Sequence, residues 1–172
     1  MAPQTRPTGY STAQIALHWL IAALVTFQLI FGEAIVPAYR AVRRGTEATA
    51  AELSAANLHV YVGLAVLALA VLRFAIRMRH GVPPAPPGES AWQRRIAGAA
   101  HLVLYGVIFA MPLTGALAWF AGVSAMGAIH ELAKPLIILT VALHAAGALW
   151  QHFVAKTDVL LRMLRPEPRR GA

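Results

Sequence analysis

The sequence contains no cysteine among its 172 residues. That absence excludes disulfides, thiolate metal sites, iron–sulfur clusters and the Cys-x-x-Cys-His attachment of c-type haem. Charged residues are also scarce, at 13% of the chain, whereas apolar residues make up 58%. The mean hydropathy is +0.59, which is too apolar for a water-soluble globule. The chain is therefore expected to lie in a lipid bilayer, with little length left for a soluble enzyme domain.

Acidic residues are the scarcest charged class, with seven against fifteen Lys and Arg, so the formal net charge is +8. In a soluble protein such an excess would suggest a nucleic-acid partner. Membrane proteins, however, concentrate Lys and Arg in their cytoplasmic loops for topological reasons. No nucleic-acid partner is therefore expected.

Four uncharged stretches, 13–32, 53–72, 96–130 and 135–155, are each long enough to cross a bilayer. The first exceeds the apolar region of a signal peptide and is expected to be retained. Together they predict one all-α domain over residues 1–172, an integral membrane four-helix bundle with spans at about 13–36, 53–76, 101–122 and 133–155. Pro37, the prolines of 83–87 and the glycines of 122–127 are expected to mark connections, with 123–129 as a surface loop.

The basic residues divide unequally between the two sides of such a bundle. Four fall on one side, namely Arg40, Arg43, Arg44 and Lys134, and the other eleven on the opposite side. The positive-inside rule then places both termini and the proline-rich loop in the cytoplasm. The chain is predicted to be a multi-pass membrane protein in that orientation.

Seven histidines in so apolar a chain indicate function, because an ionisable side chain in hydrocarbon is costly. His130 and His144 are fourteen residues apart, which corresponds to about 21 Å of helix and nearly the same face. Pro135 lies between them and is expected to interrupt the helix, so the depths are a better guide than the angle. His59 matches the outer depth of His130, and His18 matches the inner depth of His144.

Two imidazoles facing each other across a flat cavity are what six-coordinate haem iron requires. Small residues near these histidines would let the helices approach a macrocycle closely. They are Gly63, Ala145, Ala146 and Gly147. The sequence therefore predicts haems bound between the helices.

Other roles for single histidines stay open, because one buried histidine usually hydrogen-bonds a neighbouring helix and does nothing more. His101 shares the inner depth with His18, His152 is turned about 80° from His144, and His80 lies in a basic loop. Zinc is less favoured, since Glu33 and Glu131 are the only acids nearby. Methionine can replace histidine as an axial ligand but is more typical of packing; the candidates are Met78, Met111 and Met126.

Segments across most of the chain resemble the bacterial cytochrome b561 family, whose relatives include the cytochrome b subunits of nickel hydrogenase and formate dehydrogenase. The matching segments are Ile15-Ala16-Leu17-His18-Trp19-Leu20, Asn57-Leu58-His59-Val60 with Gly63, His101-Leu102-Val103-Leu104-Tyr105, Met111-Pro112-Leu113-Thr114-Gly115, His130-Glu131, Leu143-His144-Ala145-Ala146-Gly147-Ala148-Leu149, His152-Phe153 and Leu160-Leu161-Arg162-Met163. The resemblance extends from about Tyr10 to Met163.

This resemblance implies a bacterial inner-membrane cytochrome with two haem b groups. His18 and His144 would bind the inner haem, and His59 and His130 the outer haem, as axial ligands of the iron. It further implies electron transfer between a quinone and a partner at the outer face, in the manner of the family's superoxide:ubiquinone oxidoreductases.

Arg40, Arg43 and Arg44 would steer a small anion such as superoxide to the outer face. With Glu47 and Glu52 nearby, the same segment is equally well an ordinary solvated loop. The alternative functions are a haem-bearing anchor for a separate periplasmic redox protein, and a non-redox helical transporter or scaffold.

Overall fold

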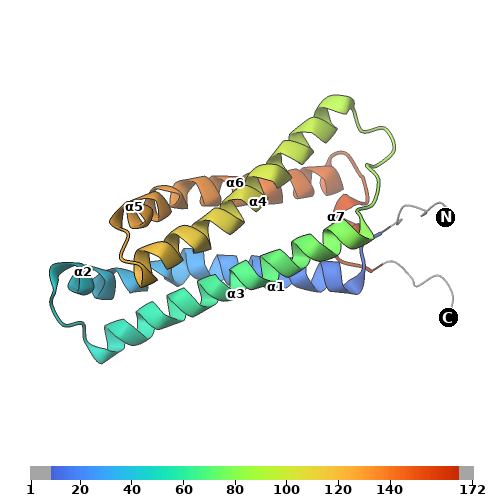
Figure 1. Cartoon of the computed structure of the whole chain (residues 1–172). Coiled ribbons are helices and arrows are strands. Elements are labelled where there is room, and N and C mark those ends of the chain that lie inside the picture. The colour runs from blue at the N-terminus through green and yellow to red at the C-terminus, as the bar shows by residue number, and fades with distance from the viewer. Residues whose placement is uncertain (1–8, 167–172) are drawn as a thin grey trace.

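The computed structural model describes residues 9–166, and within them every regular element is a helix. The order is α1 (Thr12–Phe31), the 3-10 helix η1 (Gly32–Ile35), α2 (Val36–Arg44), α3 (Ala50–His80), α4 (Ala91–Phe120), α5 (Ser124–Leu132), α6 (Lys134–Phe153) and α7 (Val159–Arg162). Four long helices run side by side along one axis (Figure 1). The predicted all-α four-helix bundle is confirmed.

Four segments are long and apolar enough to cross a membrane: Thr12–Arg44, Ala50–His80, Ala91–Phe120 and Ser124–Phe153. The helices continue beyond the predicted spans at several ends. The start of α4, for example, lies ten residues before His101 and includes Arg94 and Arg95. Helical structure therefore continues past the apolar segments.

Side chains close the first turn of three of the long helices. Ser11, Thr49 and Ser90 each accept a backbone N–H of the third helical residue, whose own side chain binds back to the cap. This reciprocal capping box satisfies backbone donors that a helix start would otherwise leave unpaired. At the other end of α3, Gly81 has a φ of 72°, which a glycine adopts without strain.

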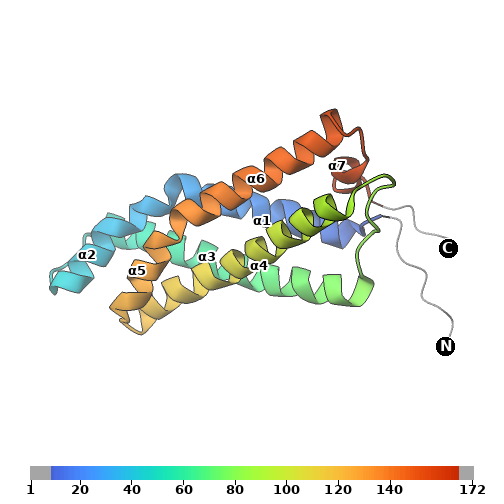
Figure 2. The same ribbon diagram turned by 90° about the horizontal axis from the view of Figure 1, so that it is seen from above.

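The two ends of the bundle differ, and Figures 1 and 2 show α2 and α5 at one end and α7 at the other. We call them the α2 end and the α7 end. Helix α1 begins at the α7 end, α3 returns there, and α4 starts from it after the proline-rich connection. His59 and His130 lie toward the α2 end, and His18 and His144 toward the α7 end.

Two sequence expectations are wrong at the α2 end. Residues 124–129, expected to form a loop, belong to the helix α5, in which Gly127 is the only residue that strongly disfavours a helix. Pro37 does not end a helix but sits in the first turn of α2, where its missing N–H costs nothing. The expected interruption before Pro135 is present, since α5 and α6 are separate helices.

The helices pack on a small apolar core and leave the rest of their apolar surface exposed. The buried cluster comprises Ile21, Val25, Val66, Ala70, Val107 and Ile137. Large apolar side chains such as Leu102 and Leu132 are three-quarters exposed. An apolar exterior of this extent fits hydrocarbon rather than water.

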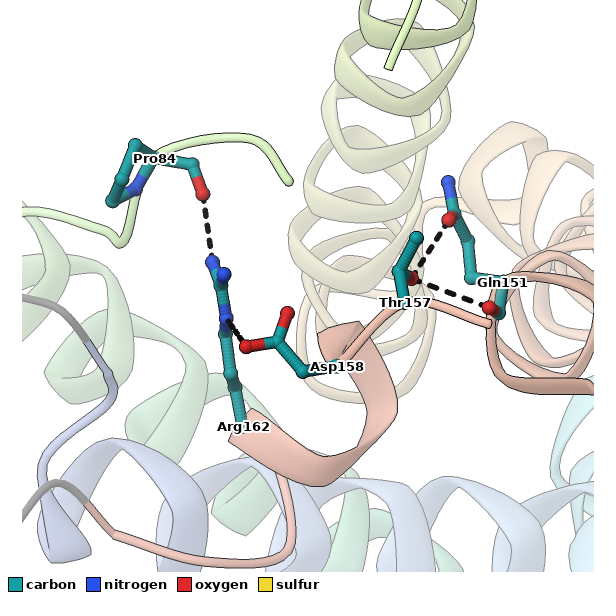
Figure 3. Close-up of polar contacts among 5 residues, drawn as sticks. All are labelled: Pro84, Gln151, Thr157, Asp158 and Arg162. Carbon is teal, nitrogen blue, oxygen red and sulfur yellow. Dashed lines mark hydrogen bonds and ion pairs between the residues drawn. The ribbon is translucent and has the colours of Figure 1, made fainter. Parts of the chain in front are cut away.

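A polar network fastens α7 against the rest of the α7 end (Figure 3). Arg162 donates to the carbonyl oxygen of Pro84 at 2.7 Å and pairs with Asp158 at 2.8 Å. Thr157 donates to the side-chain oxygen of Gln151 at 2.9 Å. The indole of Trp19 on α1 donates to the carbonyl oxygen of Met163 at 2.7 Å. The segment after α6 is thus bound to α1 and to the proline-rich connection.

Replacing Arg162 with Gln should loosen this segment, because both the bond to Pro84 and the ion pair with Asp158 are lost. An ion pair with a half-exposed carboxylate contributes at most about 1 kcal/mol, so trypsin should cleave after Lys156 roughly two- to fivefold faster. Arg165→Gln, an exposed position three residues later, is the control and should leave the rate unchanged. Equal cleavage rates in the two variants would show that the Arg162 contacts do not hold the segment.

Candidate functional site

His18 and His144 face each other at the α7 end. Their ring centroids are 6.1 Å apart and the ring planes are inclined by 65°. His18 comes from α1 and His144 from α6, and both side chains are half-buried. His18 and His144, which the sequence matches by depth, therefore meet in space.

His59 and His130 form a second pair at the α2 end. Their ring centroids are 6.0 Å apart, with an angle of 77° between the planes. His59 comes from α3 and His130 from α5, and both are half-buried. The two pairs have nearly the same separation, although four different helices supply them.

Both pairs connect helices that do not pack closely against each other. Among the described residues, α1 packs on α3, α3 on α4, and α4 on both α5 and α6, whereas neither α1 with α6 nor α3 with α5 belongs to the closely approaching pairs. Directly packed helices lie about 8–10 Å apart. The imidazoles thus reach toward each other from helices with wider spacing, as a flat group inserted between them requires.

The ring separation fits two imidazoles on opposite sides of one metal ion. A metal–imidazole bond is about 2 Å long, and a ring centroid lies about 1 Å behind its ligating nitrogen, so trans ligands have centroids about 6 Å apart. Both pairs have this separation. A zinc site would need a third or fourth ligand, and no group of three or more His, Cys, Asp or Glu side chains suits a metal ion within residues 9–166. The separation of the rings therefore fits a pair of imidazoles that hold one haem iron.

The backbone of α4 orients the His130 ring. Its Nδ1 lies 2.7 Å from the carbonyl oxygen of Met111, and because a carbonyl can only accept, Nδ1 must carry the proton. The remaining nitrogen, Nε2, then has a free lone pair for a metal. Gly115 makes room for this approach, since a Cβ there would lie 3.1 Å from two atoms of the ring. Pro112, inside the helix between these positions, removes one backbone donor from this stretch of α4.

His59 is held through its backbone rather than through its ring. Gln28 on α1 donates from its side-chain amide to the carbonyl oxygen of His59 at 2.8 Å. A Cβ at Gly32 would lie 3.3 Å from the His59 ring, so this glycine also serves a close approach. Among the described residues, the buried Nδ1 of His59 has no hydrogen-bond partner. The two rings of this pair are therefore supported differently.

The remaining histidines lie outside these pairs. His101 is the nearest to them, with its ring centroid 5.3 Å from that of His144. That distance is shorter than trans ligation gives, and His101 is exposed and binds the carbonyl of its own helix at Ala97. His80 is exposed and lies 3.2 Å from the carbonyl oxygen of Ile76. His152 contacts Phe153 at 4.8 Å between centroids.

The three arginines expected at the outer face occupy a helix instead of a loop. Arg40, Arg43 and Arg44 lie on α2 and all three are exposed. Glu52 binds the backbone N–H of Thr49 in a capping box, and Glu33 pairs with Lys134. Within residues 9–166, none of Glu33, Glu47 and Glu52 forms an ion pair with these arginines, so the surface of α2 keeps a net positive charge.

A family model described as prokaryotic cytochrome b561 matches residues 9–166 of this chain. That range includes all four paired histidines. The matched range also includes α2 and α5, the two short helices at the α2 end.

Curated relatives match over nearly their whole length. The chain is 40% identical to cytochrome b562 of Cereibacter sphaeroides over 164 residues, which covers 94% of this chain and 99% of that protein. It is 29% identical to cytochrome b561 homolog 1 of Escherichia coli, with 94% and 98% covered. It is 28% identical to a probable superoxide oxidase CybB of Yersinia pestis, with 90% and 95% covered.

Replacing Gly115 with Val should displace the His130 ring, because even a Cβ would lie 3.1 Å from it. We expect a clear loss of bound haem, measured as the pyridine haemochrome per purified chain. Gly98→Val on the same helix is the matched control, since a Cβ there would meet nothing within 4 Å. Undiminished haem in Gly115→Val would show that the close approach of His130 to α4 does not serve the site.

Proposed function

This chain belongs to the prokaryotic cytochrome b561 family and is therefore a haem b-binding electron-transfer protein of the bacterial membrane, and we propose that it holds two haems and oxidises superoxide with ubiquinone as acceptor. The observation that carries the proposal of two haems is the presence of two imidazole pairs of equal separation, 6.1 and 6.0 Å, at different levels of the bundle. Superoxide as the donor has support from the name of one relative and from the positive surface of α2.

Each pair has a defined role in this proposal. His18 and His144 would hold the haem at the α7 end, and His59 and His130 would hold the haem at the α2 end. When bound, two haem b groups supply one-electron carriers at two depths of the membrane. The protein contributes ring orientation and the exclusion of water, most clearly where the Met111 carbonyl fixes the proton of His130 on Nδ1.

The overall reaction balances with two donors for each acceptor. Two superoxide anions each lose one electron and become dioxygen, while one ubiquinone gains two electrons and two protons and becomes ubiquinol. Superoxide would approach the α2 end, where Arg40, Arg43 and Arg44 are exposed. An anion moving toward a positive surface arrives faster, and salt weakens the effect.

The orientation in the membrane follows from the charges. Eleven of the fifteen Lys and Arg belong to the α7 side in the predicted topology. The positive-inside rule then places the α7 end and both termini in the cytoplasm, with α2 and α5 on the periplasmic side. In this orientation, the α2 arginines face superoxide that is generated outside the cytoplasm.

Changing any one of His18, His59, His130 and His144 to Ala should remove one of two haems, because each iron then keeps a single protein ligand. The measurement is haem per chain, together with the reduced-minus-oxidised spectrum of the purified protein. His80→Ala, His101→Ala and His152→Ala are the controls and should keep both haems. Two haems retained in any of the four test variants would refute the ligand assignment, and a colourless wild-type chain would refute the function.

Neutralising the α2 surface should slow the reaction with superoxide. In the Arg40→Gln/Arg43→Gln/Arg44→Gln variant, we expect the second-order rate at low ionic strength to fall about tenfold and to lose most of its salt dependence. Pulse radiolysis with ubiquinone present measures both the superoxide decay and the quinone reduction.

A matched control removes three exposed arginines from the opposite end, as Arg79→Gln/Arg95→Gln/Arg165→Gln. It carries the same change in net charge but leaves the α2 surface intact, so its rate should be close to that of the wild type. An equal decrease in both variants would show a general charge effect instead of local steering. A wild-type protein with two haems and no rapid superoxide reaction would favour the alternative function, an anchor that passes electrons to a separate redox protein.

A further inference from the structure

Arg73 on α3 is a cation placed inside the bundle near the α7 end. Its side chain is half-buried, and its Nη1 donates to the backbone carbonyl of Gln14 at 2.5 Å. Gln14 is buried and donates in turn to the carbonyl oxygen of Gly81 at 3.0 Å. The guanidinium is therefore held at a defined position between α1 and α3.

This cation has no carboxylate partner within residues 9–166. The ion pairs in that range are Lys134 with Glu33 and Arg162 with Asp158. Glu89, another acid at this end, accepts a hydrogen bond from Gln151. One carbonyl satisfies one of five guanidinium N–H donors and leaves the charge uncompensated. Because a charge away from water is costly unless it is paired, the position favours an anion supplied from outside the chain.

The groups around Arg73 are donors too. The hydroxyl of Tyr105 is buried close to the guanidinium without a well-aligned hydrogen bond. Arg77, one turn along α3, lies with its guanidinium carbon 5.9 Å from the centre of the Tyr105 ring. Tyr10, Gln14, Arg73, Arg77 and Val82 line a small recess here. Two guanidinium groups and the two phenolic hydroxyls near them match an oxyanion in charge and in hydrogen bonding.

The recess lies beside the inner histidine pair. Gln14, which Arg73 contacts, precedes His18 by four residues, or about 6 Å along α1. Arg73 also lies within electrostatic range of His18, His101 and His144. A planar group clamped between His18 and His144 would therefore present its edge to this cluster of donors.

We propose that Arg73, with Tyr105 and Arg77 beside it, binds a propionate carboxylate of the haem held between His18 and His144. This inference rests on the proposed function, because it assumes a haem in that pair. A lipid phosphate has the same oxyanion chemistry and is the other possible source. The propionate is favoured because Arg73 turns toward the buried Gln14 between α1 and α3, whereas a lipid headgroup approaches from the outer surface of the bundle.

The first experiment compares haem release from Arg73→Gln with release from Arg79→Gln, an exposed arginine on the same helix. Haem transfer from each purified protein to an excess of a haem-scavenging apoprotein is followed spectroscopically. The loss of a charge-assisted hydrogen bond should speed one of the two release phases about tenfold in Arg73→Gln. Arg79→Gln should release both haems at the wild-type rates. Wild-type rates in Arg73→Gln would overturn the proposal.

The second experiment identifies the anion. Chains expressed without haem are loaded with haem dimethyl ester, which has the same macrocycle but no ionised propionate. With this cofactor, Arg73→Gln and the wild type should release the inner haem at the same rate. A difference that persists with the ester means that Arg73 acts on the packing or on another anion. A difference that disappears when anionic lipids are omitted identifies a lipid phosphate, and either result overturns the proposal.

Arg73→Lys covers the case in which Arg73→Gln fails to fold. It keeps the charge but not the planar fork, so with haem its release rate should lie between those of Arg73→Gln and the wild type. With the ester, its release rate should equal that of the wild type. The proposed function and the propionate site can be refuted separately. A wild-type chain without haem refutes the proposed function, whereas two haems with no effect of Arg73 refute only the assignment of the propionate site.

Discussion

Hydrocarbon offers no hydrogen bonds, so every polar group inside this bundle must find its partner within the protein or its cofactors. The structure meets this requirement at several depths. The ring of His130 binds the Met111 carbonyl, the amide of Gln28 binds the His59 carbonyl, and the amide of Gln14 binds the Gly81 carbonyl. Arg73 and the Nδ1 of His59 have too few hydrogen-bond partners among the described residues. Arg73 lies next to one imidazole pair, and Nδ1 of His59 belongs to the other. The unmet requirements thus gather around the sites proposed for the cofactors.

The fold and the pairing of the histidines were predictable from the sequence, because both depend on regular helix geometry. Uncharged stretches of about 20 residues predict crossings, and the fixed rise per residue converts position in the chain into depth. Depth matches His59 with His130 but leaves both His18 and His101 level with His144. The structure places the rings of His59 and His130, and of His18 and His144, about 6 Å apart, and the ring of His101 5.3 Å from that of His144. The angle calculated between His130 and His144 on one ideal helix did not predict their arrangement, because the two residues lie on separate helices.

The details that orient each ring were not predictable, because they arise from contacts between segments far apart in the sequence. Nothing local to Met111 or Gly115 indicates that His130, on another helix, will rest against them. The helix α5 was missed because glycine and small residues also suit a loop, and tertiary packing decides between the two. Arg73 was visible as a charge near a span end, but its lack of a carboxylate partner emerges only in three dimensions.

Each imidazole pair takes one member from the first half of the chain and one from the second. His18 and His59 leave the ribosome early, and their counterparts His130 and His144 leave it late. No N-terminal fragment short of α5 contains a complete pair, and the two pairs become available in the order His59–His130 and then His18–His144. Under the ligand assignment proposed above, neither haem could have both of its histidines until nearly the whole polypeptide has been synthesised.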